Sequence, residues 1–243
     1  MATPGLQVIT EYCEAYVDDI RLAEVRQTNP ALYLRQMWFF LRVAIALFNH
    51  PVEMQTYLLG TESEPRLVEP QFDSVIKTLD ADVVAGDVID LGLGTFSGYT
   101  YWTAQIRETE QDGTVYYSPC SGQYESMNGT FTFDADYPAG TVLEFDFAND
   151  GHFINTLTPE MMDILGTAFG LAWRERFNQD WISIVSKVED KSFKEQNRAT
   201  DKRANTEQIE KMRVSLAGKM RKFEQGQYYM SKVPQTARIK IRR

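Results

Sequence analysis

The sequence contains little cysteine and little histidine, two residues of each among 243. Cys13 and Cys120 lie far apart in differently patterned regions, so we expect two free thiols in a reducing compartment, with a disulfide as the alternative. His50 and His152 have no nucleophile motif beside them, and neither CxxC nor HExxH spacing occurs. We therefore expect no catalytic residue, no metal ligand and no cofactor, and the chain is not expected to be an enzyme.

The sequence also lacks the pattern of a signal peptide and of a membrane span. Its start, MATPGLQVITEYCEAY, has neither a basic beginning nor a continuous apolar run. The apolar segment 31–48 is interrupted by Arg35, Gln36 and Arg42, and an arginine at the centre of a spanning helix costs about 2.5 to 3.5 kcal/mol. We expect synthesis in the cytoplasm, a buried helix over this segment and no membrane contact.

Three other patterns have a ligand-binding interpretation beside a structural one. The segment GLGTFSGY, residues 92–99, precedes a strand pattern, whereas a phosphate cradle needs a helix amino terminus behind it. Aromatic residues of the same region fit either a sheet core or a face that binds sugar or peptide. Five carboxylates close together in the sequence could form a calcium site, although their spacing is not that of an EF-hand: Asp134, Asp136, Glu144, Asp146 and Asp150. The alternative for Glu144 and Asp146 is an ordinary outward-facing position on a strand.

Charge is unevenly spread along the chain, whose net charge is −9. Residues 186–243 hold 16 Lys or Arg against 7 Asp or Glu, whereas residues 1–185 hold 9 against 27. An acidic body with a basic end favours head-to-tail association or a polyanionic partner. A solvated helix face is the plainer alternative.

Apolar spacing predicts two helices in the first fifty residues. Tyr12, Tyr16 and Ile20 recur at helical spacing in the first of them. The second begins at Asn29 and Pro30, because asparagine caps exposed amides and proline loses nothing at the first helical position.

Two more helices are predicted near the other end of the chain. Thr158-Pro159-Glu160 combines a capping hydroxyl, a proline and a carboxylate, and predicts a helix from about 158 to the high 180s. A charged helix is predicted from about 200 to 225, and its narrow apolar stripe consists of Ile209, Met212, Leu216, Met220 and Phe223.

The region between these helices has the pattern of strands. Residues 99–106 and 141–147 alternate in side-chain character, as strands with one buried face do. Asn128-Gly129 lies between two strand-like runs and predicts a two-residue hairpin turn, because both residues tolerate positive φ. We therefore predict an α+β fold: a helical bundle formed by the N- and C-terminal helices, residues 1–51 and 156–243, with an inserted all-β domain, sandwich or barrel-like, over 52–155.

The carboxyl-terminal tail is the candidate partner-binding segment. It alternates apolar and basic residues and has no apolar core of its own, so it fits a strand added to a neighbouring sheet edge or a contact with nucleic-acid phosphates. A disordered tail is the alternative. The candidate residues are Arg238, Ile239, Lys240, Ile241, Arg242 and Arg243.

The segment from His152 to Glu224 resembles the carboxyl-terminal part of adaptor or neck proteins in the head-to-tail connector of tailed bacteriophages. In that family an aromatic residue and "LT" introduce a long helix with a tryptophan, followed by "DxxFK" and a second charged helix. The matching positions here are Phe153, Leu157, Thr158, Trp173, Asp190, Phe193 and Lys194.

The resemblance implies a non-enzymatic virion protein at the neck, in a ring of copies that joins the portal protein to the tail, to a neck-closure protein or to the next neck ring. DNA passes through the channel of such rings and is a further possible partner. The alternative is a tail or baseplate component whose β domain binds a host glycan or protein.

Overall fold

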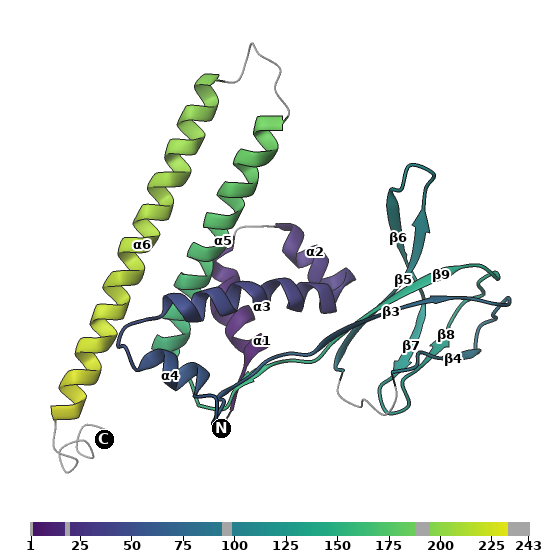
Figure 1. Cartoon of the computed structure of the whole chain (residues 1–243), viewed down its shortest axis with the longest axis horizontal. Coiled ribbons are helices and arrows are strands. Elements are labelled where there is room, and N and C mark those ends of the chain that lie inside the picture. Colours follow the sequence, from purple (N-terminus) through teal and green to yellow (C-terminus); the bar gives the residue numbers. More distant parts are fainter. Residues whose placement is uncertain (1, 18–19, 94–98, 188–194, 233–243) are drawn as a thin grey trace. The chain divides into compact units, whose positions relative to one another are not determined.

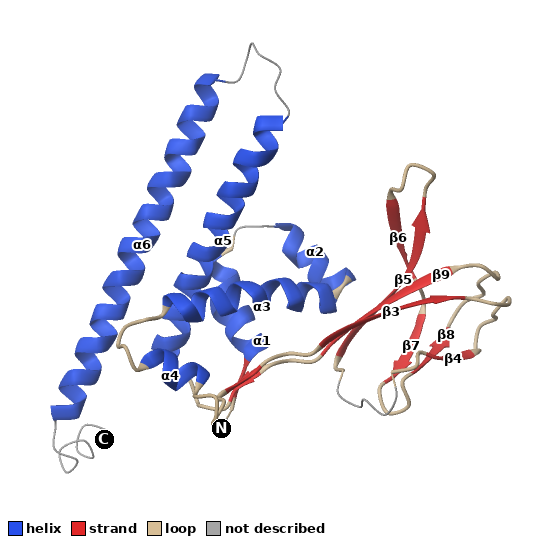
Figure 2. Cartoon of the chain, in the orientation of Figure 1, coloured by secondary structure: helices blue, strands red, loops and turns tan. Residues whose placement is uncertain are grey.

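The computed structural model describes residues 2–17, 20–93, 99–187 and 195–232. The chain divides into two compact units, which we describe separately. The first comprises Met1–Asp18, Phe39–Val68 and Phe153–Arg243, and the second comprises Asp19–Trp38 and Glu69–His152. Figure 1 follows the chain, and Figure 2 separates its helices from its strands.

The first unit is mainly helical. Its short elements are β1 (Thr3–Pro4), α1 (Gly5–Val8), a π-helical turn (Ile9–Cys13), a 3₁₀ turn (Glu14–Tyr16), α4 (Met54–Leu59) and β2 (Leu67–Val68). Its long helices are α5 (Pro159–Lys187) and α6 (Glu195–Lys232). Strand β10 (His152–Phe153) lies between β1 and β2 in a small three-stranded sheet.

Helices α5 and α6 run antiparallel, side by side (Figure 1). Met161 N–H donates to the Thr158 hydroxyl at 3.3 Å, so the predicted cap at the start of α5 is confirmed. The predicted apolar stripe of α6 is confirmed too: Met212 is half-buried, and the fully buried members are Ile209, Leu216, Met220 and Phe223.

The amino-terminal segment packs closely against α5 at two glycines. A Cβ atom on Gly166 would lie 2.5 Å from the carbonyl oxygen of Tyr12, and one on Gly170 would lie 2.5 Å from the Cβ of Tyr16. Real Cβ atoms essentially never come this close to another heavy atom. The approach of the 9–16 segment to α5 therefore depends on these two positions having no side chain.

The second unit contains most of the strands. A four-stranded antiparallel sheet has the order β3-β9-β5-β6, and a three-stranded one has the order β4-β8-β7. The strands are β3 (Phe72–Thr78), β4 (Val88–Asp90), β5 (Tyr101–Thr109), β6 (Val115–Pro119), β7 (Gly122–Glu125), β8 (Thr130–Phe133) and β9 (Val142–Ala148). The inward faces of both sheets contribute to one aromatic-rich core, whose least exposed members include Phe131, Phe133, Leu143, Phe145 and Phe147.

The helical part of the second unit is anchored to the four-stranded sheet through Asn29. This unit holds α2 (Ile20–Thr28) and the first half of α3 (Pro30–Leu47). Asn29 accepts the Leu32 amide at 2.9 Å, which confirms the predicted cap. Its amide group donates to the Asp146 carboxylate at 3.0 Å, and its oxygen accepts the Thr103 hydroxyl at 3.1 Å. One buried side chain thus starts a helix and joins it to β5 and β9.

The predicted bundle of N- and C-terminal helices around an inserted sandwich or barrel-like domain is wrong. The fold is α+β, but its strands form three separate antiparallel sheets, and no such bundle frames them in the described residues. The predicted first helix is also interrupted, because Val17 has extended backbone angles after the 3₁₀ turn. Residues 20–38, expected in the helical body, belong to the strand-rich unit, where Asn29 has its partners.

The predicted strands are present, but one turn differs. Strands β5 and β9 overlap the two segments with alternating pattern and begin one or two residues later than predicted, and the inward side chains of β9 are fully buried. The hairpin at Asn128-Gly129 joins β7 to β8 through four residues rather than two, since Glu125 pairs directly with Thr130. Gly129 has a φ of 66°, whereas no residue other than glycine has positive φ among the described residues, so Asn128 does not share the predicted conformation.

Candidate interaction surfaces

The tail residues predicted to bind a partner, Arg238 to Arg243, lie outside the described residues. Asp190, Phe193 and Lys194 of the resemblance also lie outside them. The described residues contain three other candidate sites: a polar cluster between α5 and α6, a pocket beside it, and the surface of the strand-rich unit.

The polar cluster is centred on the Lys219 ammonium of α6. It donates to the Asp163 carboxylate at 2.6 Å, to the Thr167 hydroxyl at 2.8 Å and to the Tyr16 hydroxyl at 3.0 Å. Tyr16 in turn donates to Asp163 at 2.9 Å. All three ammonium protons therefore have acceptors, and the cluster ties the amino-terminal segment to both long helices.

The protonation state of Lys219 follows from these contacts. Burial by itself lowers the pKa of Lys219, but the hydrogen bonds with Asp163 and Tyr16 outweigh it, and the net pKa is raised. Lys219 is therefore an ammonium at neutral pH, a state that stabilises an ion pair and makes a poor nucleophile.

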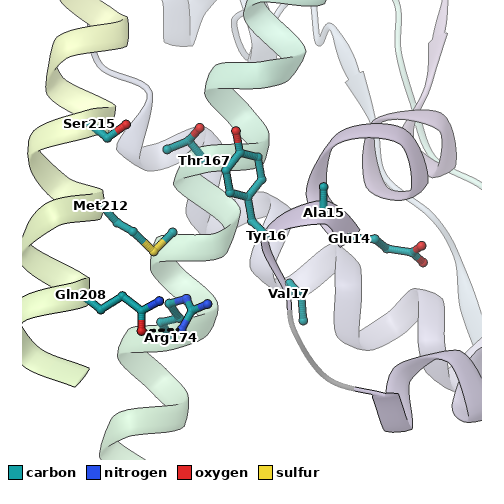
Figure 3. A pocket seen from close by; sticks show the side chains of 9 residues that line it. All are labelled: Glu14, Ala15, Tyr16, Val17, Thr167, Arg174, Gln208, Met212 and Ser215. Carbon is teal, nitrogen blue, oxygen red and sulfur yellow. Dashed lines mark hydrogen bonds between the residues drawn. The ribbon is translucent and has the colours of Figure 1, made fainter. Parts of the chain in front are cut away.

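A pocket of about 580 Å³ opens beside this cluster (Figure 3). Arg174 donates to the Gln208 side chain at 3.1 Å at one end of it, and Figure 3 shows the Glu14 carboxylate turned away from α5 and α6. The lining includes neither histidine nor cysteine, so it lacks the usual nucleophile and base pairs. The lining residues are Glu14, Ala15, Tyr16, Val17, Thr167, Arg174, Gln208, Met212 and Ser215.

Both cysteines are buried and free. Burial raises the pKa of the Cys13 thiol, and the nearby Glu14 carboxylate raises it further. Burial also raises the pKa of Cys120, against a smaller lowering by a hydrogen bond with Tyr137. Thiols with raised pKa values carry little thiolate at neutral pH, so neither is an activated nucleophile.

The strand-rich unit has a strongly acidic surface. Residues 69–152 hold 15 Asp or Glu against two basic residues, Lys77 and Arg107. Many of these carboxylates accept backbone amides in turns, as Asp82 does from Ala139 at 2.7 Å and Asp136 does from Ala85 at 2.9 Å. In the described part of the chain no three acidic, histidine or cysteine side chains are grouped so that they could hold a metal ion.

Two of the carboxylates considered for calcium, Glu144 and Asp146, have partners within the protein. Asp146 accepts the Asn29 amide, as described above, and Glu144 accepts the Tyr117 hydroxyl at 3.2 Å. Glu144 also lies 3.8 Å from the Arg107 guanidinium. Tyr117 is about half exposed on β6 and lies opposite Arg107, so this face of the sheet presents an aromatic ring and charged groups together. Its neighbour Tyr116, also about half exposed, points to the other face.

Sequence reasoning missed the Lys219 cluster and the close approach at Gly166 and Gly170. The cluster joins residues far apart in the chain, and no local sequence pattern indicates that they contact one another. The glycines did carry a signal, since two glycines four apart lie on one face of a helix and leave room for a close neighbour.

Comparisons with known proteins add no identification: no family model, no curated protein and no solved structure matches the chain. None of the described helices combines the length and the apolar character that a bilayer span requires.

Proposed function

We propose that the chain is a non-enzymatic virion protein, a ring-forming adaptor in the neck of a tailed bacteriophage that joins the portal protein to the tail or to the next neck ring. Its partners in this proposal are further copies of itself, the portal protein and a tail or neck-closure protein, with DNA passing through the channel. The sequence resemblance suggests this function, and the exposed faces of the long helix α6 and the uneven distribution of charge support it.

The observation that carries the proposal is the α5–α6 hairpin. Helix α6 has 38 residues, a length of about 57 Å at 1.5 Å per residue. Its described part buries one stripe against its own chain, and the remaining faces are exposed, including Val214 at 66%. A long helix with one buried stripe has surface available for neighbouring copies, as a ring requires.

Charge also favours contacts between copies. Helix α6 holds nine Lys or Arg against five Asp or Glu, whereas residues 69–152 hold two against 15. Opposite charges on separate units of one chain favour head-to-tail contacts, in which the basic part of one copy meets the acidic part of the next. Such heterologous contacts generate a closed ring when the rotation between copies closes.

A host-binding tail or baseplate component is the second candidate. The exposed Tyr117 beside Glu144 and Arg107 favours it, because aromatic and charged groups on one face together bind sugars and peptides. The adsorption of particles to host cells, measured with and without the purified chain, separates the two functions. A host-binding component competes with particles for the cell surface, whereas a neck adaptor leaves adsorption unchanged.

The test of the neck assignment is a nonsense mutation in the gene, followed by electron microscopy of the particles formed. We expect DNA-filled heads and separate tails, with joined particles restored when the protein is supplied from a plasmid. Complete, infectious particles made without the protein would refute the assignment. Particles with joined tails that no longer adsorb would support the host-binding alternative.

A further inference from the structure

Strand β3 forms one edge of the four-stranded sheet. Two hydrogen bonds at its ends show which of its residues bond to β9 and which face outward. The Asn149 amide donates to the Gln71 carbonyl at 3.2 Å, and the Leu79 amide donates to the Thr141 carbonyl at 3.0 Å. Odd-numbered residues of β3 therefore bond to β9, and the even-numbered residues direct their amides and carbonyls away from the sheet.

The outward backbone groups of β3 are open to another strand. The Ser74 amide is satisfied by the Asp73 carboxylate at 2.8 Å. Those of Ile76 and Thr78 have no strand to pair with in the described part of the chain, because the sheet order begins at β3. Ile76 is also 52% exposed. An exposed edge with an apolar residue and unpaired amides is a template for strand addition.

The other sheet edges are less suited to this role. Strand β6 ends in Pro119, which has no amide proton and blunts an edge. Strands β4 and β7 have three and four residues, against seven in β3. Strand β3 therefore presents the longest proline-free edge in the described part of this unit.

The two faces beside β3 differ in chemistry. On one face Ile76 lies directly opposite Glu144 of β9. On the other face Val75 packs against the buried core of the unit. A strand added at this edge would place one set of its side chains beside Ile76, with the Glu144 carboxylate one strand further in, and the other set beside Val75. Long basic side chains in the first set can extend past Ile76 toward Glu144, and apolar side chains in the second set would extend the core, so alternating basic and apolar residues suit this edge.

Residues 238–243 have this alternation. Their sequence is Arg-Ile-Lys-Ile-Arg-Arg, with four basic residues among six. They complement the acidic composition of residues 69–152 described above. We propose that the segment 238–243 of a neighbouring copy adds as a strand to the free edge of β3. The inference rests on the proposed ring, because it names the contact that joins one copy to the next.

Photo-crosslinking of the full chain tests this contact. Ile241 is replaced by p-benzoylphenylalanine, and copies labelled with ¹⁵N are mixed with unlabelled copies before irradiation. We expect the crosslinks to join residue 241 to residues 72–78, with mixed isotope composition that shows two separate copies. Higher salt should lower the yield, because the contact is partly electrostatic.

Two substitutions in β3 separate backbone pairing from apolar contact. Ile76→Pro removes an outward amide and no bond within the sheet, whereas the control Ile76→Thr removes the apolar side chain and keeps the amide. We expect Ile76→Pro to lower the crosslink yield about tenfold and Ile76→Thr to lower it much less. Circular dichroism and thermal melting of both variants show that each is folded.

Several results would overturn the proposal: crosslinks within one copy, crosslinks to the helices, crosslinks to DNA in particles, no crosslink, or equal yields from the two β3 variants. The outcome is separate from that of the neck assignment. Tail-to-β3 crosslinks in a protein absent from the neck would refute the function alone. Rings at the neck with tails crosslinked elsewhere would refute the strand contact alone.

Discussion

The most discriminating test of the fold is alanine substitution at four helical glycines. In α5, a Cβ at Gly166 would meet the Tyr12 carbonyl oxygen at 2.5 Å, and one at Gly170 would meet the Tyr16 Cβ at 2.5 Å. In α6, a Cβ at Gly218 or at Gly226 would meet nothing within 4 Å. The same chemical change is thus made in two crowded positions and in two open ones.

The expected effects have opposite signs. Alanine is favoured over glycine by about 1 kcal/mol in a helix interior, and this gain applies at all four positions. At Gly166 and Gly170 overpacking costs about 2 to 3 kcal/mol, the upper part of the usual range, because the opposing atoms belong to the backbone or to its rigid Cβ. We therefore expect Gly218→Ala and Gly226→Ala to stabilise by about 0.4 to 1 kcal/mol. Gly166→Ala should destabilise by about 1 to 2 kcal/mol.

Urea unfolding followed by circular dichroism at 222 nm measures these changes, because the long helices dominate that signal. The two α6 variants serve as matched controls for the gain in helix propensity. Equal stabilisation by Gly166→Ala and Gly218→Ala would show that the amino-terminal segment does not lie against α5 as described.

Three further predictions concern single side chains. Lys219→Met should cost about 1 to 3 kcal/mol at pH 7. Since the folded pKa of Lys219 is raised, its contribution is fully present below the unfolded value of about 10.4 and is lost as pH rises through the folded pKa. The difference between the two proteins in urea unfolding should therefore be constant from pH 7 to 9 and shrink at higher pH; the reverse trend would contradict the ion pair. Asn29→Ala should cost about 1 to 3 kcal/mol, since it removes a cap and two side-chain hydrogen bonds, one buried and one partly buried. Thr28→Ala on the exposed helix end should change stability by less than about 0.5 kcal/mol. Cys13 and Cys120 should react with Ellman's reagent only on unfolding, and fast reaction of the native protein would contradict their burial.

Local features of the fold were predictable from the sequence. The cap at Thr158, the apolar stripe of α6 and the buried alternation of β9 depend on neighbours within a turn of helix or along one strand. These signals are carried by residues three or four apart in helices and two apart in strands.

The tertiary contacts were not predictable in this way. The cap role of Asn29 follows from the sequence, but its bond to Asp146 joins residues 117 positions apart. This contact joins the start of α3 to the strand-rich unit. The apolar spacing of the helix does not reveal the contact, so the sequence alone favoured a helical bundle. The four-residue turn at Gly129 likewise depends on the register of β7 against β8, which dipeptide preference does not fix.

The candidate site was least accessible to sequence reasoning. The Lys219 cluster forms only when α6 runs antiparallel to α5, so its members carry no common pattern. The edge of β3 becomes a site because no strand follows it in the described sheet, a property of topology rather than of composition.

Immunogold labelling of tailed particles from the source of this protein tests the central claim most directly. The proposed neck adaptor predicts gold at the junction of head and tail, in the same position on every labelled particle. Gold at the tail tip, or no gold on any particle under conditions that label a known virion protein, would contradict it.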